Sequence, residues 1–268
     1  MSGIEMGEMI QLPLPAEEEI PTTLFALPTR GLVTFPGLVL PILLETPYAQ
    51  NIVGSAQQHS GFIGLFASTS EKPGPARKSE FCRVGVAARI MKLMNLPDGG
   101  KSAMVQGLRR VRLVRFEALE PIPRVQVKLL RETGVRGARA EAQVRNLRTL
   151  AREVLQKSGA FPEEFRAAAI TAIGNIDKVG NLCDFTAAYL LKEADLRQKV
   201  LETARLSRRL DLVVESLHKE LQIVELGQSI QDEIRAKTEK MQKEYFLREQ
   251  IKIIRRELGE EKDARQEE

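Results

Sequence analysis

Short apolar runs separated by proline and glycine dominate the first half of the chain. Valine, leucine and isoleucine prevail in these runs, and several alternate with polar residues in the two-residue period of a half-buried strand. One helix fits among them, because Thr46 suits the N-cap and Pro47 the first helical position. We therefore expect a mostly β region with strands at Leu24–Leu27, Leu38–Leu44, Phe62–Ala67, Arg83–Leu96, Ser102–Leu119 and Arg124–Leu130.

A helical pattern begins after Gly134 and Gly137, where apolar residues recur every three or four positions. All 13 prolines lie at or before Pro162. Since an interior proline costs a helix about 3 kcal/mol, the long proline-free remainder is typical of helix. The pattern predicts helices over Ala138–Lys157, from Pro162 to Ala172 and over Asn181–Leu191, followed by a helical tract to Leu258.

The helical tract carries a narrow apolar seam. Seven of nine residues are apolar at alternating steps of four and three, at positions 196, 200, 203, 207, 210, 214, 217, 221 and 224. Such spacing indicates a partner helix along the seam. Beyond Gly227 the seam shifts to Ile223, Ile230, Ile234, Met241 and Tyr245. A single straight helix from 191 to 258 would be about 100 Å long. The tract therefore either folds back near Gly227 or projects as an arm.

Charge is distributed unevenly along the chain. The net charge of +4 divides into 0 − 5 = −5 for residues 1–20, 14 − 6 = +8 for 21–130 and 26 − 25 = +1 for 131–268. An acidic start without Lys or Arg has the wrong sign for a secretory or transit peptide. The longest apolar run, Leu32–Leu44, contains two prolines and is too short for a membrane helix. We expect a flexible leader over residues 1–21 and a cytoplasmic protein without membrane contact.

The chemical motifs in the chain are sparse. Gly100-Lys101-Ser102 resembles the end of a phosphate-binding loop, but the required earlier glycine is Asn95 and no helix follows. The segment is better interpreted as a hairpin turn. The two histidines are about 160 positions apart, and the two cysteines have no neighbouring ligand, so catalytic and metal sites have no support.

Arginines alternate with apolar residues in the fifth expected strand. This pattern most simply gives the solvent-exposed face of a half-buried strand. Cationic strands on small barrels also bind nucleic acid, although the stacking aromatics that such binding uses are almost absent nearby. Both interpretations concern Arg109, Arg110, Arg112 and Arg115.

Three segments resemble the N-terminal region of bacterial ATP-dependent Lon proteases. The first is the strand and Phe-Pro-Gly turn within residues 27–41, and the second is Asn95-Leu96-Pro97-Asp98-Gly99 followed by Val105–Arg110. The third is the tail Lys243–Lys252 with Glu257-Leu258-Gly259-Glu260. The resemblance covers about residues 22–260. It implies an α+β chain with a PUA-like β barrel over 22–130, a helical subdomain over 131–191 and a long coiled-coil-like arm over 192–268.

The same resemblance implies a function in protein quality control. Family members bind misfolded and regulatory proteins, assemble as hexamers, and carry an ATPase and a Ser-Lys peptidase in later modules. This chain contains neither motif, so we expect no catalytic residue, cofactor or metal here, with ATP and Mg belonging to the absent ATPase module. Exposed apolar side chains suit client capture. We expect substrate contacts at Phe35, Pro36, Leu38, Met91, Met94 and Leu96, and assembly contacts at Met241, Tyr245, Phe246 and Leu247.

Two other functions fit parts of the pattern. One is a non-proteolytic adaptor that self-associates through the seam over residues 196–224. The other is a nucleic-acid-binding module that uses the arginine strand, whose affinity would fall steeply with salt.

Overall fold

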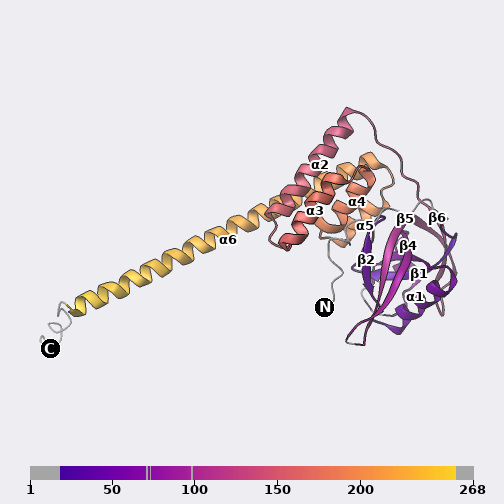
Figure 1. Ribbon diagram of the computed structural model, residues 1–268, viewed down its shortest axis with the longest axis horizontal. Coiled ribbons are helices and arrows are strands. Elements are labelled where there is room, and N and C mark those ends of the chain that lie inside the picture. Colours follow the sequence, from indigo (N-terminus) through magenta and orange to yellow (C-terminus); the bar gives the residue numbers. More distant parts are fainter. Residues whose placement is uncertain (1–18, 71, 73, 98, 258–268) are drawn as a thin grey trace. The chain divides into compact units, whose positions relative to one another are not determined.

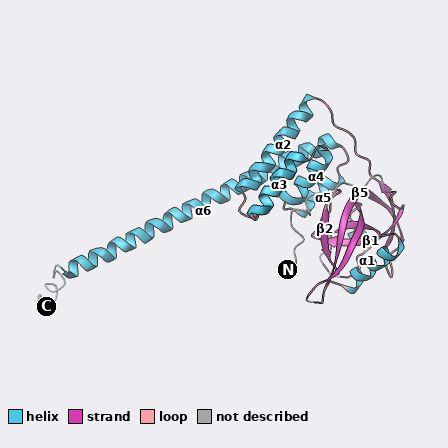
Figure 2. Cartoon of the chain, in the orientation of Figure 1, coloured by secondary structure: helices cyan, strands magenta, loops and turns pink. Residues whose placement is uncertain are grey.

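The computed structural model describes residues 19–70, 72, 74–97 and 99–257 (Figure 1). The chain divides after Leu221 into two compact units, and each is described separately below. The expected leader lies almost wholly outside the described residues. Strands occupy the N-terminal part of the first unit and helices follow them, which confirms the expected α+β class (Figure 2). Among the described residues, no helix is both long and apolar enough to cross a membrane.

Within the described residues, six strands form one sheet in the order β2-β5-β4-β3-β1-β6. Its longest strand, β5, pairs with β4 and β2 and also with β6, so the sheet curls back on itself. A bulge at Leu108 and a second at Met91 bend the long β4–β5 hairpin. The strands are β1 (Thr23–Arg30), β2 (Val39–Leu43), β3 (Phe62–Ser68), β4 (Val84–Asn95), β5 (Lys101–Ala118) and β6 (Arg124–Leu129).

The first helix follows β2 as expected. α1 (Pro47–His59) begins with proline, and the Thr46 hydroxyl accepts a hydrogen bond from the Ala49 amide at 3.2 Å. This bond satisfies one of the amides that a helix start leaves unpaired. The buried side of α1 presents Ile52, Val53 and Ala56 to a core cluster that includes Ile63 and Leu65 of β3.

A larger core lies between the sheet and the helices. Four short helices and the beginning of α6 (Leu206–Glu257) enclose it. The sheet contributes Val84 and Val86 from β4, together with Phe35 from the preceding turn. The helices cover this outer side of the sheet, so the β region and the helices share one core. The short helices are α2 (Ala138–Lys157), α3 (Glu163–Asn175), α4 (Val179–Leu190) and α5 (Ala194–Glu202).

The structure differs from the expected arm in two places. The helical tract is interrupted at residues 203–205, where Arg205 forms a β-bridge with Thr133. The helix α6 then continues through Gly227, so it does not fold back there. Residues 194–221 belong to the first unit, and the second unit starts at Gln222, 30 residues later than the expected start of the arm at 192.

The apolar seam finds its partners inside the chain. Val200, Leu210, Leu217 and Leu221 are buried in the shared core. The remaining seam positions are half-buried. Self-association through residues 196–224, which the adaptor alternative requires, would need this core to open. The seam therefore serves folding of the first unit.

The second unit, from Gln222 onward, is helical throughout its described residues, 222–257. Its large apolar side chains are exposed, in contrast to those of the first part of α6. They are Ile223, Leu226, Ile230, Ile234, Met241, Tyr245, Phe246, Leu247, Ile251, Ile253 and Ile254.

Candidate functional site

Arg110 lies at the junction between the sheet and the helices. It pairs with Val86 across the β4–β5 ladder, so its side chain extends on the side of the sheet that the helices cover. Only 4% of it is exposed. The expectation that Arg110 belongs to a solvent-exposed strand face is therefore wrong, because that face is covered at this position. Arg109, Arg112 and Arg115 are exposed as expected.

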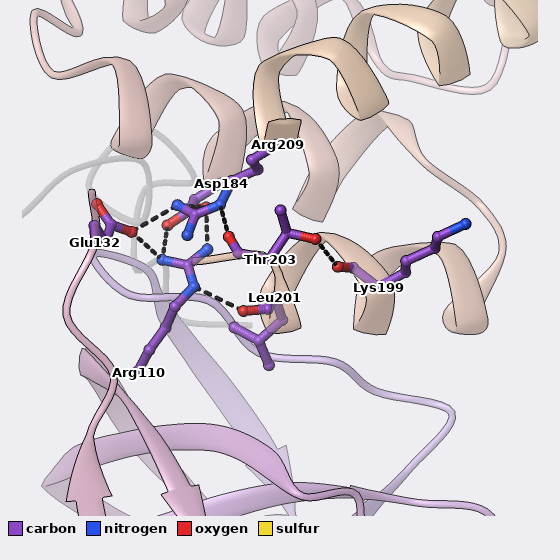
Figure 3. A network of polar contacts seen from close by, with 7 residues as sticks. All are labelled: Arg110, Glu132, Asp184, Lys199, Leu201, Thr203 and Arg209. Atoms are coloured by element: carbon purple, nitrogen blue, oxygen red, sulfur yellow. Dashed lines mark hydrogen bonds and ion pairs between the residues drawn. The ribbon is translucent and has the colours of Figure 1, made fainter. Parts of the chain in front are cut away.

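Two carboxylates hold the buried Arg110 guanidinium (Figure 3). Asp184 from α4 accepts two hydrogen bonds, 2.5 Å from Nη2 and 2.8 Å from Nη1. Glu132, in the linker after β6, accepts a third from Nη1 at 2.8 Å. Nε donates to the Leu201 carbonyl at 2.9 Å. Arg110 therefore connects β5 to the linker, to α4 and to the end of α5.

Arg209 completes the cluster from the first turn of α6. It is fully buried and donates to Glu132 at 2.6 Å and to the Thr203 carbonyl at 2.8 Å. Its Nη1 lies 3.5 Å from Asp184. We call Arg110, Glu132, Asp184 and Arg209 the junction cluster. Arg110, Asp184 and Arg209 are buried and Glu132 is exposed at the surface. Two positive and two negative groups balance, and buried charges are tolerated when they are paired in this way.

Electrostatics keep the buried Arg110 guanidinium protonated. Burial acts to lower the pKa of Arg110, but the adjacent Asp184 and Glu132 carboxylates outweigh it and raise that pKa above its ordinary value. Burial also raises the pKa of the neighbouring Cys183 thiol to about 12. A thiol with this pKa stays protonated near neutral pH and is a poor nucleophile. Cys183 therefore offers no nucleophile here, and the contacts of the cluster hold β5, the linker and the helices together.

Three members of the junction cluster were missed by sequence reasoning. Asp184 had a detectable signal, because it is a lone acid within the apolar run Leu182-Cys183-Asp184-Phe185. A buried acid in such a run needs a cationic partner. Glu132 and Arg209 lie in polar surroundings in the sequence, and nothing distinguishes them from surface charges until the fold brings them together.

A cleft with both polar and apolar walls opens beside the junction cluster. Its volume is about 950 Å³, and its walls come from β5, the linker after β6 and the start of α4. Arg110, Glu132 and Asp184 lie along it, together with the exposed Arg109. Pro36, which was expected to contact substrate, is half-buried in the same wall.

The other predicted residues of the first turn are not surface residues. Phe35 is completely buried and Leu38 is 8% exposed, so both belong to the core shared by sheet and helices. The turn packs directly on β5, where the amide of Gly37 donates to the Gly107 carbonyl at 2.8 Å. The prediction that Phe35 and Leu38 form an exposed apolar surface is therefore wrong. The apolar character of this turn serves packing.

The β4–β5 hairpin does present apolar side chains. Met91 is 45% exposed, and Met94 and Leu96 are half-buried. Sequence reasoning missed two further members, Leu93 at 46% exposure and Leu43 at 59%. The register places Leu43 and Met94 on either side of Ser102, in one row across β2, β5 and β4. We call Leu43, Met91, Leu93, Met94 and Leu96 the apolar tip.

The Gly100-Lys101-Ser102 segment leads from the turn of this hairpin into β5. Leu96 donates its amide to the Gly100 carbonyl at 2.8 Å, and Gly99 adopts a φ of +82° that favours glycine. Lys101 begins a strand, so no helix start faces this loop. The hairpin interpretation is confirmed, and the arrangement lacks the helix that a phosphate-binding loop requires.

The predicted assembly residues lie in the second unit. Met241, Tyr245, Phe246 and Leu247 are all exposed. Met241 and Tyr245 continue the row formed by Ile223, Ile230 and Ile234. Exposure of this many large apolar groups on one helix is consistent with a surface that another molecule covers.

Comparisons with known proteins agree with this fold. A family model described as the ATP-dependent protease La (LON) substrate-binding domain matches residues 23–219. A Lon protease of Dictyoglomus thermophilum is 33% identical over 91% of this chain and 30% of its own length. Lon protease 2 of Myxococcus xanthus is 34% identical over 91% of this chain and 29% of its own length.

Solved structures give the same fold. The N-terminal domain of a Mycobacterium avium complex Lon protease aligns with a TM-score of 0.60 at 20% identity, over 73% of this chain and 98% of that domain. A Lon N-terminal domain protein from Xanthomonas campestris aligns with a TM-score of 0.51 at 14% identity, over the same shares. The chain spans about 30% of the length of its first curated relatives. It belongs to the Lon protease family and contains that family's substrate-binding domain.

Proposed function

We propose that this chain recognises polypeptide substrates for an ATP-dependent protease and that the apolar tip is its contact surface. The clients are misfolded and regulatory proteins that expose apolar segments. The observation that carries the proposal is the exposure of Leu43, Met91 and Leu93 on a rigid sheet in a chain that matches a substrate-binding family. Methionine suits varied clients because its flexible thioether adapts to different shapes.

In this function the chain binds substrate and carries out no chemical step. ATP and Mg binding and Ser-Lys peptide cleavage belong to other modules of the parent protease, which acts as a homohexamer in the cytoplasm. The exposed arm residues Met241, Tyr245, Phe246 and Leu247 contribute to that assembly. The isolated chain is accordingly expected to bind unfolded protein without ATP and to leave it uncut.

The salt dependence of binding distinguishes apolar substrate capture from electrostatic binding of a partner such as nucleic acid. Burial of apolar surface contributes about 25 cal/mol per Å² and has little ionic component. Contacts through Arg109 and Arg112 would instead weaken as the Debye length falls to about 8 Å at physiological salt. Apolar capture should therefore be nearly insensitive to salt.

The test measures binding of a denatured, fluorescently labelled protein at low and high salt. The variants are Met91→Ser/Leu93→Ser and, as a matched surface control, Arg109→Ala/Arg112→Ala. Weaker binding by the first variant alone, unchanged by salt, supports the proposal. Weaker binding by the arginine variant alone, with strong salt dependence, contradicts it and favours an electrostatic partner.

A further inference from the structure

Strand β2 is an open edge of the sheet. Within the described part of the chain it pairs with β5 and with no other strand. An edge strand leaves every second set of backbone N–H and C=O groups unpaired. The direction of these groups therefore decides what the edge can bind.

The ladder shows which backbone groups of β2 face outward. The Gly107 amide donates to the Leu38 carbonyl at 2.8 Å, and the Leu44 amide donates to the Lys101 carbonyl at 2.8 Å. Hydrogen-bonded pairs alternate in an antiparallel ladder, so Leu40 and Ile42 also bond to β5. The backbone groups of residues 39, 41 and 43 therefore point away from the sheet.

A cleft of about 450 Å³ is lined by residues 41–43 of this strand. Its lining comes from the second half of β1, from β2 itself and from the start of α1. Leu27, Leu32 and Ile42 give it apolar walls, and Arg30 and Glu45 supply one charge of each sign. The balanced charge does not select for acidic or basic partners. The cleft is within the size range of sites that enclose ligands.

We propose that the open edge of β2 captures substrate in extended form, by accepting a segment of unfolded polypeptide as an added strand. The inference rests on the proposed function and specifies how that substrate is held. Only an extended backbone matches the row of outward N–H and C=O groups, and such pairing is independent of client sequence. Leu43 belongs both to this edge and to the apolar tip, so one segment can engage both.

Pro41 at the middle of β2 limits the strength of capture. Proline has no N–H, so the edge offers two donors, from residues 39 and 43, and three carbonyl acceptors. A short edge interrupted by proline resists indiscriminate pairing and aggregation. Capture should therefore be weak and reversible, as a domain that passes substrates onward requires.

A matched pair of variants isolates the backbone contribution. Leu43→Ala removes the side chain and keeps the N–H, whereas Leu43→Pro removes both. Neither change breaks the β2–β5 ladder, because the amide of Leu43 faces outward. The probe is a labelled, capped peptide of about ten residues that alternates apolar and polar side chains. We expect Leu43→Pro to bind it about fivefold more weakly than Leu43→Ala, the effect of one lost hydrogen bond.

Hydrogen exchange on the wild-type 268-residue chain tests the inference without any variant. In the free protein, the amides of Leu40 and Ile42 should exchange slowly and those of Val39 and Leu43 quickly. Saturating peptide should slow exchange at Val39 and Leu43. The control is a peptide with two consecutive N-methylated amides. Because successive amides of an extended strand point to opposite edges, both edges of this peptide are blocked, and it should give no such protection.

The outcomes separate this inference from the proposed function. Equal binding by Leu43→Ala and Leu43→Pro, with no new protection at Val39 and Leu43, overturns strand addition. If Met91→Ser/Leu93→Ser still weakens binding in that case, the proposed function holds and substrate is captured by the apolar tip without strand addition. If that variant also binds as well as the wild type, the proposed function fails with it.

Discussion

The junction cluster and the apolar tip both include residues of the long β4–β5 hairpin: Arg110 in the cluster, and Met91, Leu93, Met94 and Leu96 in the tip. The two regions depart from the usual placement of residues in opposite ways. At the junction, Arg110, Asp184 and Arg209 are buried while Glu132 reaches the surface, and every charged group has a partner of opposite sign. At the tip, large apolar groups are left in solvent. Buried charges are costly when a partner is missing, whereas exposed apolar groups add little to folding and remain available for binding. One end of the hairpin therefore determines stability, and the other is free to serve recognition.

Removing one junction carboxylate should have the largest effect on stability. Asp184→Ala leaves the Arg110 guanidinium buried with Glu132 as its remaining carboxylate. Breaking a buried ion pair in this way typically costs about 3–5 kcal/mol. Urea denaturation followed by circular dichroism measures the loss. Arg109→Ala, an exposed change on the same strand, is the control and should cost less than about 0.5 kcal/mol. Equal stability of the two variants would refute the structural role of the cluster.

A smaller loss is expected where the first turn packs on β5. In Gly107→Ala, the added Cβ would lie 2.4 Å from the Phe35 carbonyl oxygen, so the backbone must move. Overpacking of this kind costs about 1–3 kcal/mol. The matched control is Gly54→Ala in α1, where nothing lies within 4 Å of the new Cβ. That change should raise stability by roughly 0.5–1 kcal/mol, since alanine favours helix. Thermal unfolding measures both changes in stability. A Gly107→Ala variant as stable as the wild type would contradict the close packing of the turn on β5.

Substitutions in the apolar tip should have almost no effect on the stability of the fold. Met91→Ser/Leu93→Ser alters side chains that are about half exposed, so the free energy of unfolding should change by no more than about 0.5 kcal/mol per residue. Denaturant titration of the variant used for the substrate-binding test gives this value. A loss of several kcal/mol would place these residues in the core and remove the contrast with the junction.

The arm should have no effect on the first unit. Phe246→Ala/Leu247→Ala changes exposed residues of the second unit, so unfolding of the first unit should be unaltered. Assembly of the full-length enzyme should weaken, because truncated apolar groups cost about 2–5 kcal/mol each where an interface buries them. Analytical ultracentrifugation measures the oligomer, and an unchanged size in the variant would exclude an assembly role for these residues.

Local patterns were sufficient for most of the secondary structure. The Thr46-Pro47 signal placed the start of α1, and Ala138–Lys157 has the bounds of α2. The errors came where a second layer covers the first. Phe35 and Arg110 lie on the outer side of the sheet, and alternation within one strand carries no information about helices that follow much later in the chain, such as α4 with Asp184, 74 residues after Arg110. The break at residues 203–205 was equally invisible, because no proline marks it.

The exposed row on the second unit determines the geometry of any helix that pairs with it. Residues 223, 230, 234, 241 and 245 are separated by steps of seven and four, so the row repeats every eleven residues. Eleven residues in three turns correspond to about 3.67 residues per turn, slightly more than the 3.6 of a straight helix. A partner that follows this row runs almost straight, with a slight right-handed twist. The left-handed winding of a heptad coiled coil would move the row out of contact within a few turns.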